Sequence, residues 1–414
     1  MLREAGISRQ FSLHNTFASL KYPNYRLWFA GQLISLVGTW AQSAAQGYLI
    51  YELTKSPAYL GYASFANGLP TWIFTLYAGA IADRVSRRTL MVITQSGMMI
   101  LAFVLAVLTF TNTVQWWHIL ILSFLLGVCN AFDAPARQAF VLEMVDREDL
   151  TNAIALNSTM FNLAMVMGPA FGGLIYAWVG PGWCFTINAI SFIAVIIALL
   201  LMKLKPFIPV KTNGSTVSDV KEGLKYVANH PSVKMLIFNL FIITILGLGI
   251  AALIPAWSVV VLGGDATTNG FLMAARGIGS LIGALMIAAL GRMRIHGKLW
   301  TINSLILPVS MVIFAFMQWL IPSLLAMALM GFAFMMIVNL SNSMVQTRIA
   351  DEMRGRVMGV YTFFFFGAMP LGALISGWTA AIVGEPLTVI SSAVILLLFA
   401  VWVIWKQPAL RAME

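Results

Sequence analysis

The sequence has very few charged residues. Asp, Glu, Lys and Arg make up 10% of its 414 residues, whereas hydrophobic residues make up 60%. A typical soluble domain is about one quarter charged, so a surface with so few charges could not be well solvated. This composition excludes an ordinary soluble protein. It predicts that lipid covers much of the surface.

Cysteine and histidine are also scarce, which limits the chemistry that the chain can carry. Cys129 and Cys184 both lie in apolar runs and form no disulfide or metal-binding pattern. No histidine has a carboxylate four residues later, and no glycine-rich phosphate-binding loop is present. We therefore expect no catalytic residue, no metal and no cofactor. A membrane-embedded enzyme remains the alternative from a different class. The four histidines are dispersed over separate loops: His14, His118, His230 and His296.

What the sequence does contain is long apolar runs, each able to span a bilayer. A polar segment divides them into two sets of six, which predicts an all-α membrane protein of twelve transmembrane helices in two six-helix halves. The predicted domains are residues 1–202, a cytoplasmic linker at 203–232, and residues 233–414. Residues 217–228 of the linker read as an amphipathic surface helix. The predicted spans are 25–50, 57–82, 88–111, 115–134, 152–178, 182–202, 233–262, 268–290, 299–319, 322–346, 357–382 and 385–405.

The basic residues are distributed very unevenly over the predicted loops. Of the 25 Lys and Arg residues, all except Lys55 and Arg276 fall on one side of the membrane if both termini are placed in the cytoplasm. Cytoplasmic loops are enriched in Lys and Arg, so this distribution predicts a multi-pass protein of the inner (plasma) membrane with both termini cytoplasmic. It also explains the net charge of +10 without a nucleic-acid partner.

The two sets of spans carry related loops. Asp83-Arg84-Val85-Ser86-Arg87-Arg88 follows the second span, and a second basic loop, from Gly291 to Lys298, follows the eighth about 208 residues later. Parallel halves related by an axis along the membrane normal are the arrangement of major facilitator transporters. The repeat therefore predicts that the halves share one fold.

Particular motifs strengthen this resemblance. The run from Gly79 through Asp83, Arg84, Arg87 and Arg88 resembles the major facilitator loop between helices two and three, with Ser86 in place of the usual glycine. Further segments resemble the enterobactin-exporter-like branch of that superfamily, which contains siderophore and drug exporters. The resemblance implies transport by alternating access, with protons as the coupling ion. The segments are Gly31–Trp40, Asp133–Gln138, Glu148–Ser158 and Gly168–Gly173.

Charged residues of these motifs predict a conformational latch at the cytoplasmic side. We expect Asp83 to face the N-terminus of the eleventh helix near Val357, where the helix dipole favours an anion. We also expect Arg87 to reach Asp133. These contacts would hold the halves together in the outward-open state. For Arg84 and Arg88, the alternative is that they are ordinary loop charges that only set topology.

A glycine-proline motif lies in the middle of the fifth span. The proline, Pro169, removes one backbone hydrogen bond. The small residues permit close helix contact, and they are Gly168, Gly172 and Gly173. In the family that the chain resembles, such a motif is associated with export. The alternative is plain small-residue packing.

One basic residue lies inside a predicted span. Arg276 would be costly in lipid unless it faces water or a partner. We expect it to attract an acidic group of the substrate. The alternative is that it hydrogen-bonds carbonyl groups and braces its helix.

Neutral polar residues form a stripe on the first helix. Their spacing puts them on one face, which we expect to line a wet cavity. Asn157, Asn239 and Asn339 on other spans are expected to join it, although an interhelical hydrogen bond is the alternative for each. About two rings of the run Phe363–Phe366 should also reach the cavity. The stripe consists of Gln32, Ser35, Thr39, Gln42, Ser43 and Gln46.

These observations lead to a functional prediction. The chain is expected to be a monomeric secondary transporter that exports an amphipathic, acidic or phenolic small molecule, with a siderophore as the first choice. A multidrug efflux transporter and a lysophospholipid flippase are the alternatives within transporters. Its partners would be this small molecule, membrane lipid and protons. With no acid at mid-membrane depth, the candidate proton carriers are Asp133, Asp83 and His118.

Overall fold

The spanning segments are helical and close to the predicted lengths. A computed structural model of the chain describes residues 17–82, 85–204, 216–290 and 295–411. The helices of the first half are η1 (Ala18–Lys21), α2 (Pro23–Thr54), α3 (Pro57–Ala82), α4 (Arg87–Phe110), α5 (Trp116–Phe140), η2 (Val141–Glu143), α6 (Leu150–Val179) and α7 (Pro181–Leu201).

The second half follows a short linker helix. Its elements are α8 (Thr216–Asn229) in the linker, then α9 (Pro231–Ile243), η3 (Thr244–Leu248), η4 (Gly249–Leu253), α10 (Ile254–Val260), α11 (Ala266–Leu290), α12 (His296–Phe316), α13 (Leu320–Gln346), η5 (Asp351–Met353), α14 (Arg354–Val383), α15 (Glu385–Lys406) and α16 (Pro408–Arg411).

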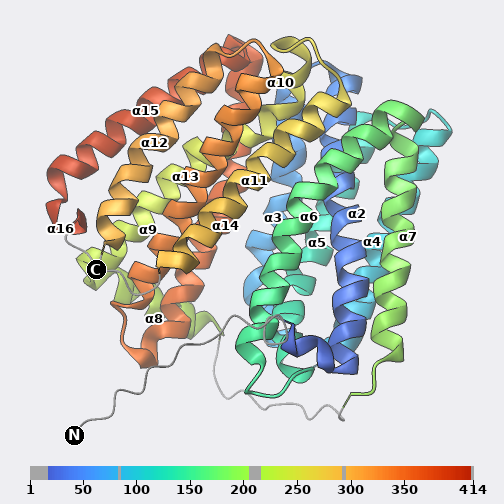
Figure 1. The fold of residues 1–414 in the computed structure, drawn as a ribbon, viewed down its shortest axis with the longest axis horizontal. Helices are drawn as coiled ribbons and strands as arrows, with labels where there is room; N and C mark the ends of the chain where they lie inside the picture. Colours follow the sequence, from blue (N-terminus) through green and yellow to red (C-terminus); the bar gives the residue numbers. More distant parts are fainter. Residues whose placement is uncertain (1–16, 83–84, 205–215, 291–294, 412–414) are drawn as a thin grey trace, which may run out of the picture.

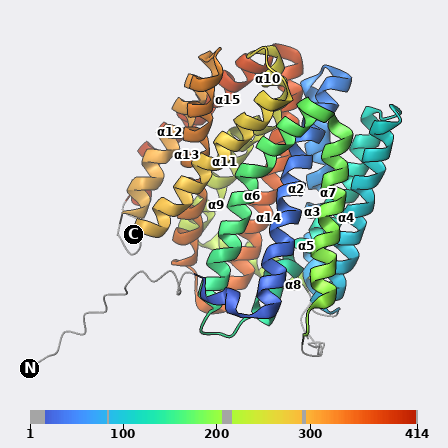
Figure 2. The same ribbon diagram turned by 45° about the vertical axis from the view of Figure 1, so that its right-hand side comes forward.

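Ten of these helical stretches, counted over the described residues, are long and apolar enough to cross a membrane. Helices α2 and α3, of 32 and 26 residues, complete the twelve predicted spans. On the flanks of the bundle, α4 and α7 lie on one side and α12 and α15 on the other (Figures 1 and 2). These flanks expose large apolar side chains to their surroundings, as a lipid-facing surface would. Examples are Ile93, Ile100, Val107, Ile197, Leu201, Ile302, Val309, Leu398 and Trp405.

Two equivalent turns join the last two helices of each half. Gly180 links α6 to α7 with a φ of 92°, and Gly384 links α14 to α15 with a φ of 85°. Glycine adopts positive φ without steric cost, which allows each helix pair to reverse direction in a single residue. The internal repeat therefore extends to the turn geometry.

The seventh spanning segment departs from the prediction of one continuous helix. Between α9 and α10, the π-helical turn η3 is followed directly by the 3₁₀ segment η4. A Cβ atom at Gly249 would lie 2.5 Å from the backbone of Gly372 on α14, so the irregular stretch packs backbone to backbone against that helix. Irregular turns of this kind often mark functional positions in a helix.

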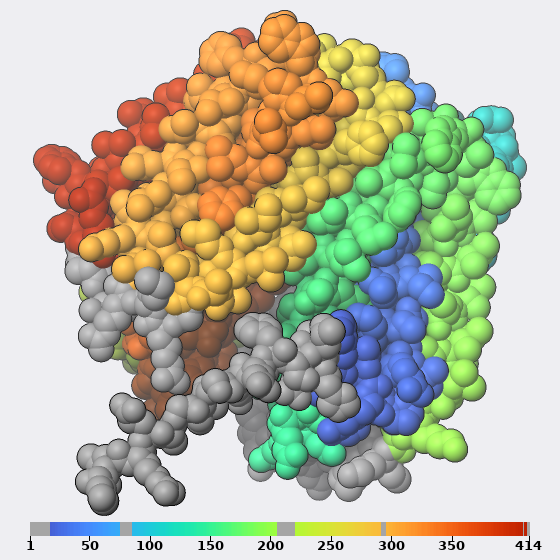
Figure 3. Space-filling model, viewed as in Figure 1, coloured from blue at the N-terminus to red at the C-terminus, as the bar shows by residue number. Residues whose placement is uncertain are grey.

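The two halves meet at one end and separate at the other. We call the end at which α8 lies the linker end, and the opposite end the distal end (Figure 1). Near the distal end, the carbonyl oxygen of Ala266 would lie 2.4 Å from a Cβ at Gly173, and that of Pro57 would lie 2.7 Å from a Cβ at Gly377. In the space-filling view, α6 and α11 touch along the upper part of the face, and the surface is hollowed between them lower down (Figure 3).

An ordered segment before α2 fastens to the loop between η2 and α6. We call Ser19, Lys21 and Tyr22 the N-terminal clamp: the Ser19 hydroxyl lies 2.7 Å from Asn152 Oδ1, and Lys21 Nζ lies 2.6 Å from Asp149. The hydrogen bond from Lys21 lowers the pKa of Asp149 below its usual 3.8, and the same contact raises the pKa of Lys21 above its usual 10.5. The clamp ties the start of the first span to the start of the fifth.

Candidate functional site: two cavities between the halves

A large cavity of about 630 Å³ lies between the two halves. Its walls come from α2 and α6 of the first half, and from η3 to α10, α11, α12, α13 and α14 of the second. It extends toward the linker end, where Arg137 and Gln138 of α5 line it. A site between the repeats is the usual place for a ligand in this type of fold.

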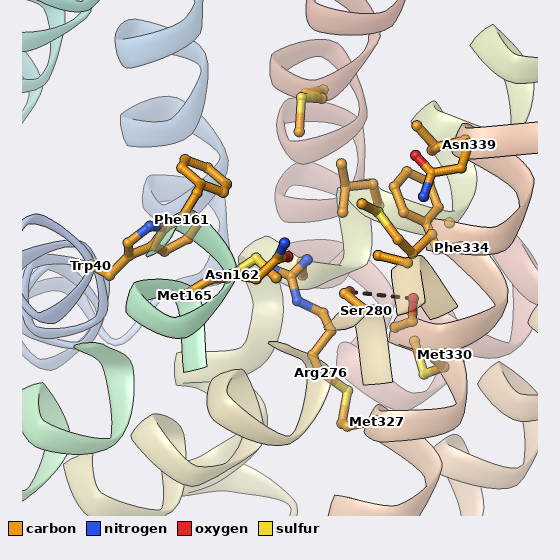
Figure 4. Close-up of a pocket in the computed structure, with 18 of the residues that line it drawn as sticks. Trp40, Phe161, Asn162, Met165, Arg276, Ser280, Met327, Met330, Phe334 and Asn339 are labelled. Atoms are coloured by element: carbon orange, nitrogen blue, oxygen red, sulfur yellow. Dashed lines mark hydrogen bonds between the residues drawn. The ribbon is translucent and has the colours of Figure 1, made fainter. Parts of the chain in front are cut away.

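Arg276 on α11 projects into this cavity, toward the side on which Asn162 and Met165 lie (Figure 4). A Cβ at Gly331 would lie 2.1 Å from the Arg276 carbonyl oxygen, so α13 packs directly on α11 behind it. Among the residues that the structure describes, none hydrogen-bonds or ion-pairs with the guanidinium. The predicted alternative of a bracing contact to carbonyl groups is therefore not observed within the described chain. The cation is left available to a ligand.

Neutral hydrogen-bonding groups share the cavity with Arg276. Asn157 and Asn339 line it, and their amides bond to no described protein group. Asn162 donates to the Ser158 carbonyl at 2.8 Å, and Ser280 donates to the Gly331 carbonyl at 3.3 Å. The cavity thus offers one positive charge that has no partner among the described residues, that of Arg276, a second arginine, Arg137, that pairs with Asp133, and two amides with no partner in the described chain.

Twelve further residues of the cavity lining are methionine or aromatic. The expected two rings of the phenylalanine run reach it, namely Phe365 and Phe366. The methionines were not predicted, although the 24 methionines of the sequence were an available signal. Methionine is flexible and polarizable, so a wall rich in it can adapt to differently shaped apolar groups. The other methionine and aromatic residues here are Trp40, Phe161, Met165, Trp257, Phe314, Met327, Met330, Phe334, Met335 and Met369.

The polar stripe of the first helix lines a separate cavity of about 270 Å³. Gln42 accepts a hydrogen bond from Asn188 Nδ2 at 2.7 Å, and Gln46 donates to Ser123 Oγ at 2.8 Å. Thr39 also lines this cavity. The stripe residues Gln32 and Ser35 are instead buried. The sequence therefore predicted one polar surface on this helix but not the division of the space between the helices into two cavities.

Asn239 does not line either of these two cavities, which corrects the prediction that it contributes to the site. Its side chain is buried on α9 and donates to Gln407 Oε1 at 3.0 Å. This is the interhelical hydrogen bond that a lone asparagine commonly makes in a bundle.

The contact between Arg87 and Asp133 that was predicted for the outward-open state is not made in this structure, which is open toward the linker end. Arg87 pairs with Glu143 at 2.6 Å, and Arg88 donates to the Leu200 carbonyl at 2.7 Å. Both contacts stay within the first half, because Glu143 and the end of α7 lie closer to the start of α4. Asp83 and Arg84 lie outside the described residues, and Gly79 lies in α3.

Asp133 is held between α4 and α5 by neutral donors. Thr94 Oγ1 lies 3.0 Å and Gln95 Nε2 lies 2.9 Å from one carboxylate oxygen, and Arg137 Nε lies 3.4 Å from the other. The Asp133 side chain is 4% exposed. Since Arg137 also lines the large cavity, the buried acid is linked to that cavity through its partner.

The glycine-proline motif of α6 forms two packing surfaces. Gly168 and Gly172 approach α2 closely, with Cβ positions 2.4 Å from Trp40 Cβ and 2.5 Å from the Ala41 carbonyl. Gly173 faces the other half, where it meets Gly270 and Ala266. Small-residue packing therefore accounts for the motif structurally, and its association with export stays a prediction.

Comparisons with known proteins agree with this architecture. The family described as transmembrane secretion effectors matches residues 14–414. The chain is 24% identical over 361 residues to the staphyloferrin A transporter of Staphylococcus aureus, covering 87% of this chain and 90% of that one. It is 27% identical over 409 residues to the multidrug efflux pump Tap of Mycobacterium tuberculosis, covering 95% of both.

Solved structures show the same fold at low sequence identity. The nucleoside transporter NupG superposes with a TM-score of 0.73 at 14% identity, covering 92% of this chain and 98% of that one. A POT family transporter bound to 5-aminolevulinic acid superposes with a TM-score of 0.74 at 10% identity, covering 94% and 97%. The chain is therefore a multi-pass membrane transporter of the major facilitator superfamily, and it belongs to the family of transmembrane secretion effectors.

Proposed function

We propose that this transporter exports an amphipathic organic anion, with a siderophore as the first candidate. The observation that carries the proposal is the guanidinium of Arg276, which has no partner among the described residues and lies in a cavity lined by many methionine and aromatic side chains. A charge-assisted hydrogen bond in a site of low dielectric is strong, and the apolar wall suits the body of an amphipathic molecule. The relatives' names, which include a siderophore transporter and efflux pumps, support export.

The adaptable wall also supports a second candidate, multidrug efflux. Methionine-rich surfaces repack around different ligands, and one relative carries the name macrolide efflux protein A, from Streptococcus pyogenes, at 23% identity over 382 residues. The two candidates differ in charge preference. A dedicated anion exporter depends on Arg276, whereas a pump for apolar drugs does not.

The side of the membrane that the large cavity faces follows from the proposed topology. With the basic loops and both termini in the bacterial cytoplasm, the linker end is cytoplasmic and the large cavity opens inward. The packed glycines then close the outer side. The division into residues 1–202, 203–232 and 233–414 and the monomeric state are parts of the same proposal.

Protons are the proposed coupling ion, and Asp133 is the proposed carrier. Besides Arg137, Asp133 bonds to Thr94 and Gln95, two uncharged donors whose hydrogen bonds a neutral carboxyl group would still accept. Protonation of Asp133 would release Arg137 toward the cavity, where it would assist Arg276. Binding of the anion in the large cavity would thereby be coupled to protonation of Asp133.

Single-cysteine labelling tests the topology. In a background with Cys129→Ser and Cys184→Ala, a cysteine at Ser86 should resist a membrane-impermeant maleimide in intact cells and react after permeabilisation. A cysteine at Asn112, in the turn between α4 and α5, is the control expected to react in intact cells. Efficient labelling at Ser86 from outside would overturn the assignment and with it the inward-open state.

Replacing Arg276 tests the substrate charge. The probe is dansylglycine, an aromatic anion, compared with its neutral methyl ester. Arg276→Ala should reduce dansylglycine uptake into inside-out vesicles about tenfold or more, the loss expected for one charge-assisted hydrogen bond, and Arg276→Lys should restore part of it. Binding of the ester to purified protein should change less than about twofold, because the ester carries no charge for the guanidinium to bind.

The control is Arg348→Ala, which removes an arginine in the turn after α13 that donates to the Met344 carbonyl of that helix and does not line the cavity. It should leave dansylglycine uptake near the original value. Equal losses for the anion and its ester in well-folded Arg276→Ala protein would refute anion recognition and favour the multidrug candidate.

A further inference from the structure

The small cavity differs from the large one in its chemistry. Its described lining includes no charged side chain, whereas it includes five carboxamides and four hydroxyls. It lies among α2, α3, α5 and α7 of the first half, beside η4 and α10 of the second. The carboxamides are Gln42, Gln46, Asn67, Asn130 and Asn188, and the hydroxyls are those of Thr39, Ser43, Ser64 and Ser123.

Close helix packing brings these amides together. A Cβ at Gly38 would lie 2.8 Å from Asn188 Oδ1, so α7 approaches α2 and sets Asn188 beside Gln42. A Cβ at Gly127 would lie 2.0 Å from the Asn67 carbonyl oxygen, so α3 approaches α5 one turn before Asn130. Glycine at these two positions therefore allows four helices to present their amides to one space.

The amides form a hydrogen-bonded chain that leaves part of its capacity open. Asn188 donates to Gln42, Gln42 donates to Gln46 at 3.4 Å, and Gln46 donates to Ser123. This chain fixes the direction of each carboxamide. The side chains of Asn130 and Ser64 have no hydrogen bond to any described protein group, although both face the cavity.

The small cavity lies next to the large one, and the two share part of a wall. Ala251 of η4 lines both cavities, so the irregular part of the seventh spanning segment forms the wall between them. The lining residues of α3, and Ser123 and Leu126 of α5, come from the halves of those helices nearer the distal end, and Asn130 lies just past the middle of α5. A molecule that leaves the large cavity for the distal end would therefore pass this polar space.

We infer that the small cavity is a second binding site, which takes an uncharged amide or polyhydroxyl group. Open carboxamides and hydroxyls can donate to and accept from such a group, whereas a carboxylate would be desolvated there without a cation. The inference rests on the proposed function only in assigning this group to the transported molecule. The substrate would then present an anion to Arg276 and a neutral hydrogen-bonding group to Asn130 and Ser64.

Fluorine NMR of two small probes tests the second site. 4-Fluorobenzamide and 4-fluorobenzoate share one shape and differ in charge, and each is titrated into the full-length transporter in nanodiscs. Fluorobenzamide should bind, and Asn130→Leu should weaken its binding about fivefold or more, the loss of one or two hydrogen bonds. Ser64→Ala, a smaller change that leaves the packing intact, should weaken it about threefold. Fluorobenzoate binding should be unaffected by either variant.

The matched control is Asn157→Leu, which removes an asparagine from the large cavity only. It should leave fluorobenzamide binding unchanged. No fluorobenzamide binding to the original protein, or a loss that follows Asn157 or Arg276 but neither Asn130 nor Ser64, would overturn the second site. Failure of dansylglycine export with the expected fluorobenzamide pattern would instead refute the proposed function and leave the second site standing.

Discussion

The two ends of the transporter hold their parts together in different ways. At the distal end, the halves meet through glycines whose Cβ positions would overlap the facing backbone, such as Gly173 against Ala266. At the linker end, charged side chains pair within the first half, as Arg87 does with Glu143, or between α8 and α14, as Glu222 does with Arg356. Close packing of glycines against backbone therefore holds the distal end together, whereas ion pairs are characteristic of the linker end.

The difference indicates which end is easier to perturb. Backbone contacts within a bundle add many small dispersion terms and require no charge to be desolvated, but they tolerate no added atom. Exposed ion pairs tolerate substitution, because water and counterions replace the lost partner. Side-chain volume should therefore dominate at the distal end, and charge should matter at the linker end mainly where the group is buried.

The largest effect is expected from Gly173→Leu. The added side chain cannot fit against α11 and should force the distal ends apart, reducing transport by about tenfold or more because overpacking of close contacts costs about 1–3 kcal/mol. Spin labels at Trp178 and Trp319, exposed distal positions in opposite halves, should move apart. Gly359→Leu is the control, because a Cβ there meets nothing within 4 Å. Unchanged distances in Gly173→Leu would show that shape does not close this end.

A narrower effect, limited to uptake driven by a pH gradient, is expected from Asp133→Asn, which removes the buried charge of the linker end while keeping an acceptor for Thr94 and Gln95. Uptake driven by a pH gradient should fall about tenfold, whereas equilibrium exchange of dansylglycine across vesicles without a gradient should persist. Asp351→Asn, which removes an exposed charge paired with Arg354, is the control and should change neither assay. Transport that still follows the pH gradient in Asp133→Asn would exclude this residue as the proton carrier.

The smallest effect is expected at the N-terminal clamp. Asp149 has a depressed pKa, so its contribution is present above pH 3.8 and is lost as the pH falls through the lower folded-state value. Lys21 has a raised pKa, so its contribution is present below pH 10.5 and is lost as the pH rises through the higher folded-state value.

Hydrogen exchange at the Ser19 amide, which donates to Asn152, should therefore be pH-independent between about pH 5 and 9 after correction for intrinsic exchange. Lys21→Met should accelerate it only about twofold to threefold, because the lysine side chain is 61% exposed. A steep pH dependence of this exchange rate between pH 5 and 9 would contradict the conclusion that the ion pair of Lys21 with Asp149 stabilises the N-terminal clamp.

The sequence predicted the fold well because lipid imposes a simple rule on composition. The predicted span 88–111 corresponds to α4 at Arg87–Phe110, and the span 385–405 corresponds to α15 at Glu385–Lys406. Each helix must satisfy its own backbone in lipid, so apolar length alone reveals it. The break between α9 and α10 was not predictable, since it depends on the contact of Gly249 with α14 across the fold.

The site was predicted only in part, for a related reason. Arg276 is conspicuous in an apolar span, so its place in the large cavity could be expected. Whether Asn239 faced water or another helix depended on Gln407, 168 residues away in the sequence. Whether Arg87 pairs with Asp133 or with Glu143 likewise depends on tertiary packing, and in the structure it pairs with Glu143. Which side chains from distant segments pair depends on the tertiary packing, and this packing cannot be read from any single stretch of sequence.

The broken seventh segment has a consequence for the winding of its helix. An α-helix turns about 100° per residue, the 3₁₀ segment η4 turns about 120°, and the wider π turn η3 winds less than either. Relative to an α-helix, η3 therefore rotates too little and η4 rotates too much. Because the two segments are of equal length, these differences in rotation about the helix axis largely cancel. If the stretch from Thr244 to Leu253 were regular α-helix, α9 and α10 would therefore keep nearly the same rotational orientation relative to each other. Only the residues between them would turn, and with them the side chains that this wall presents to each cavity.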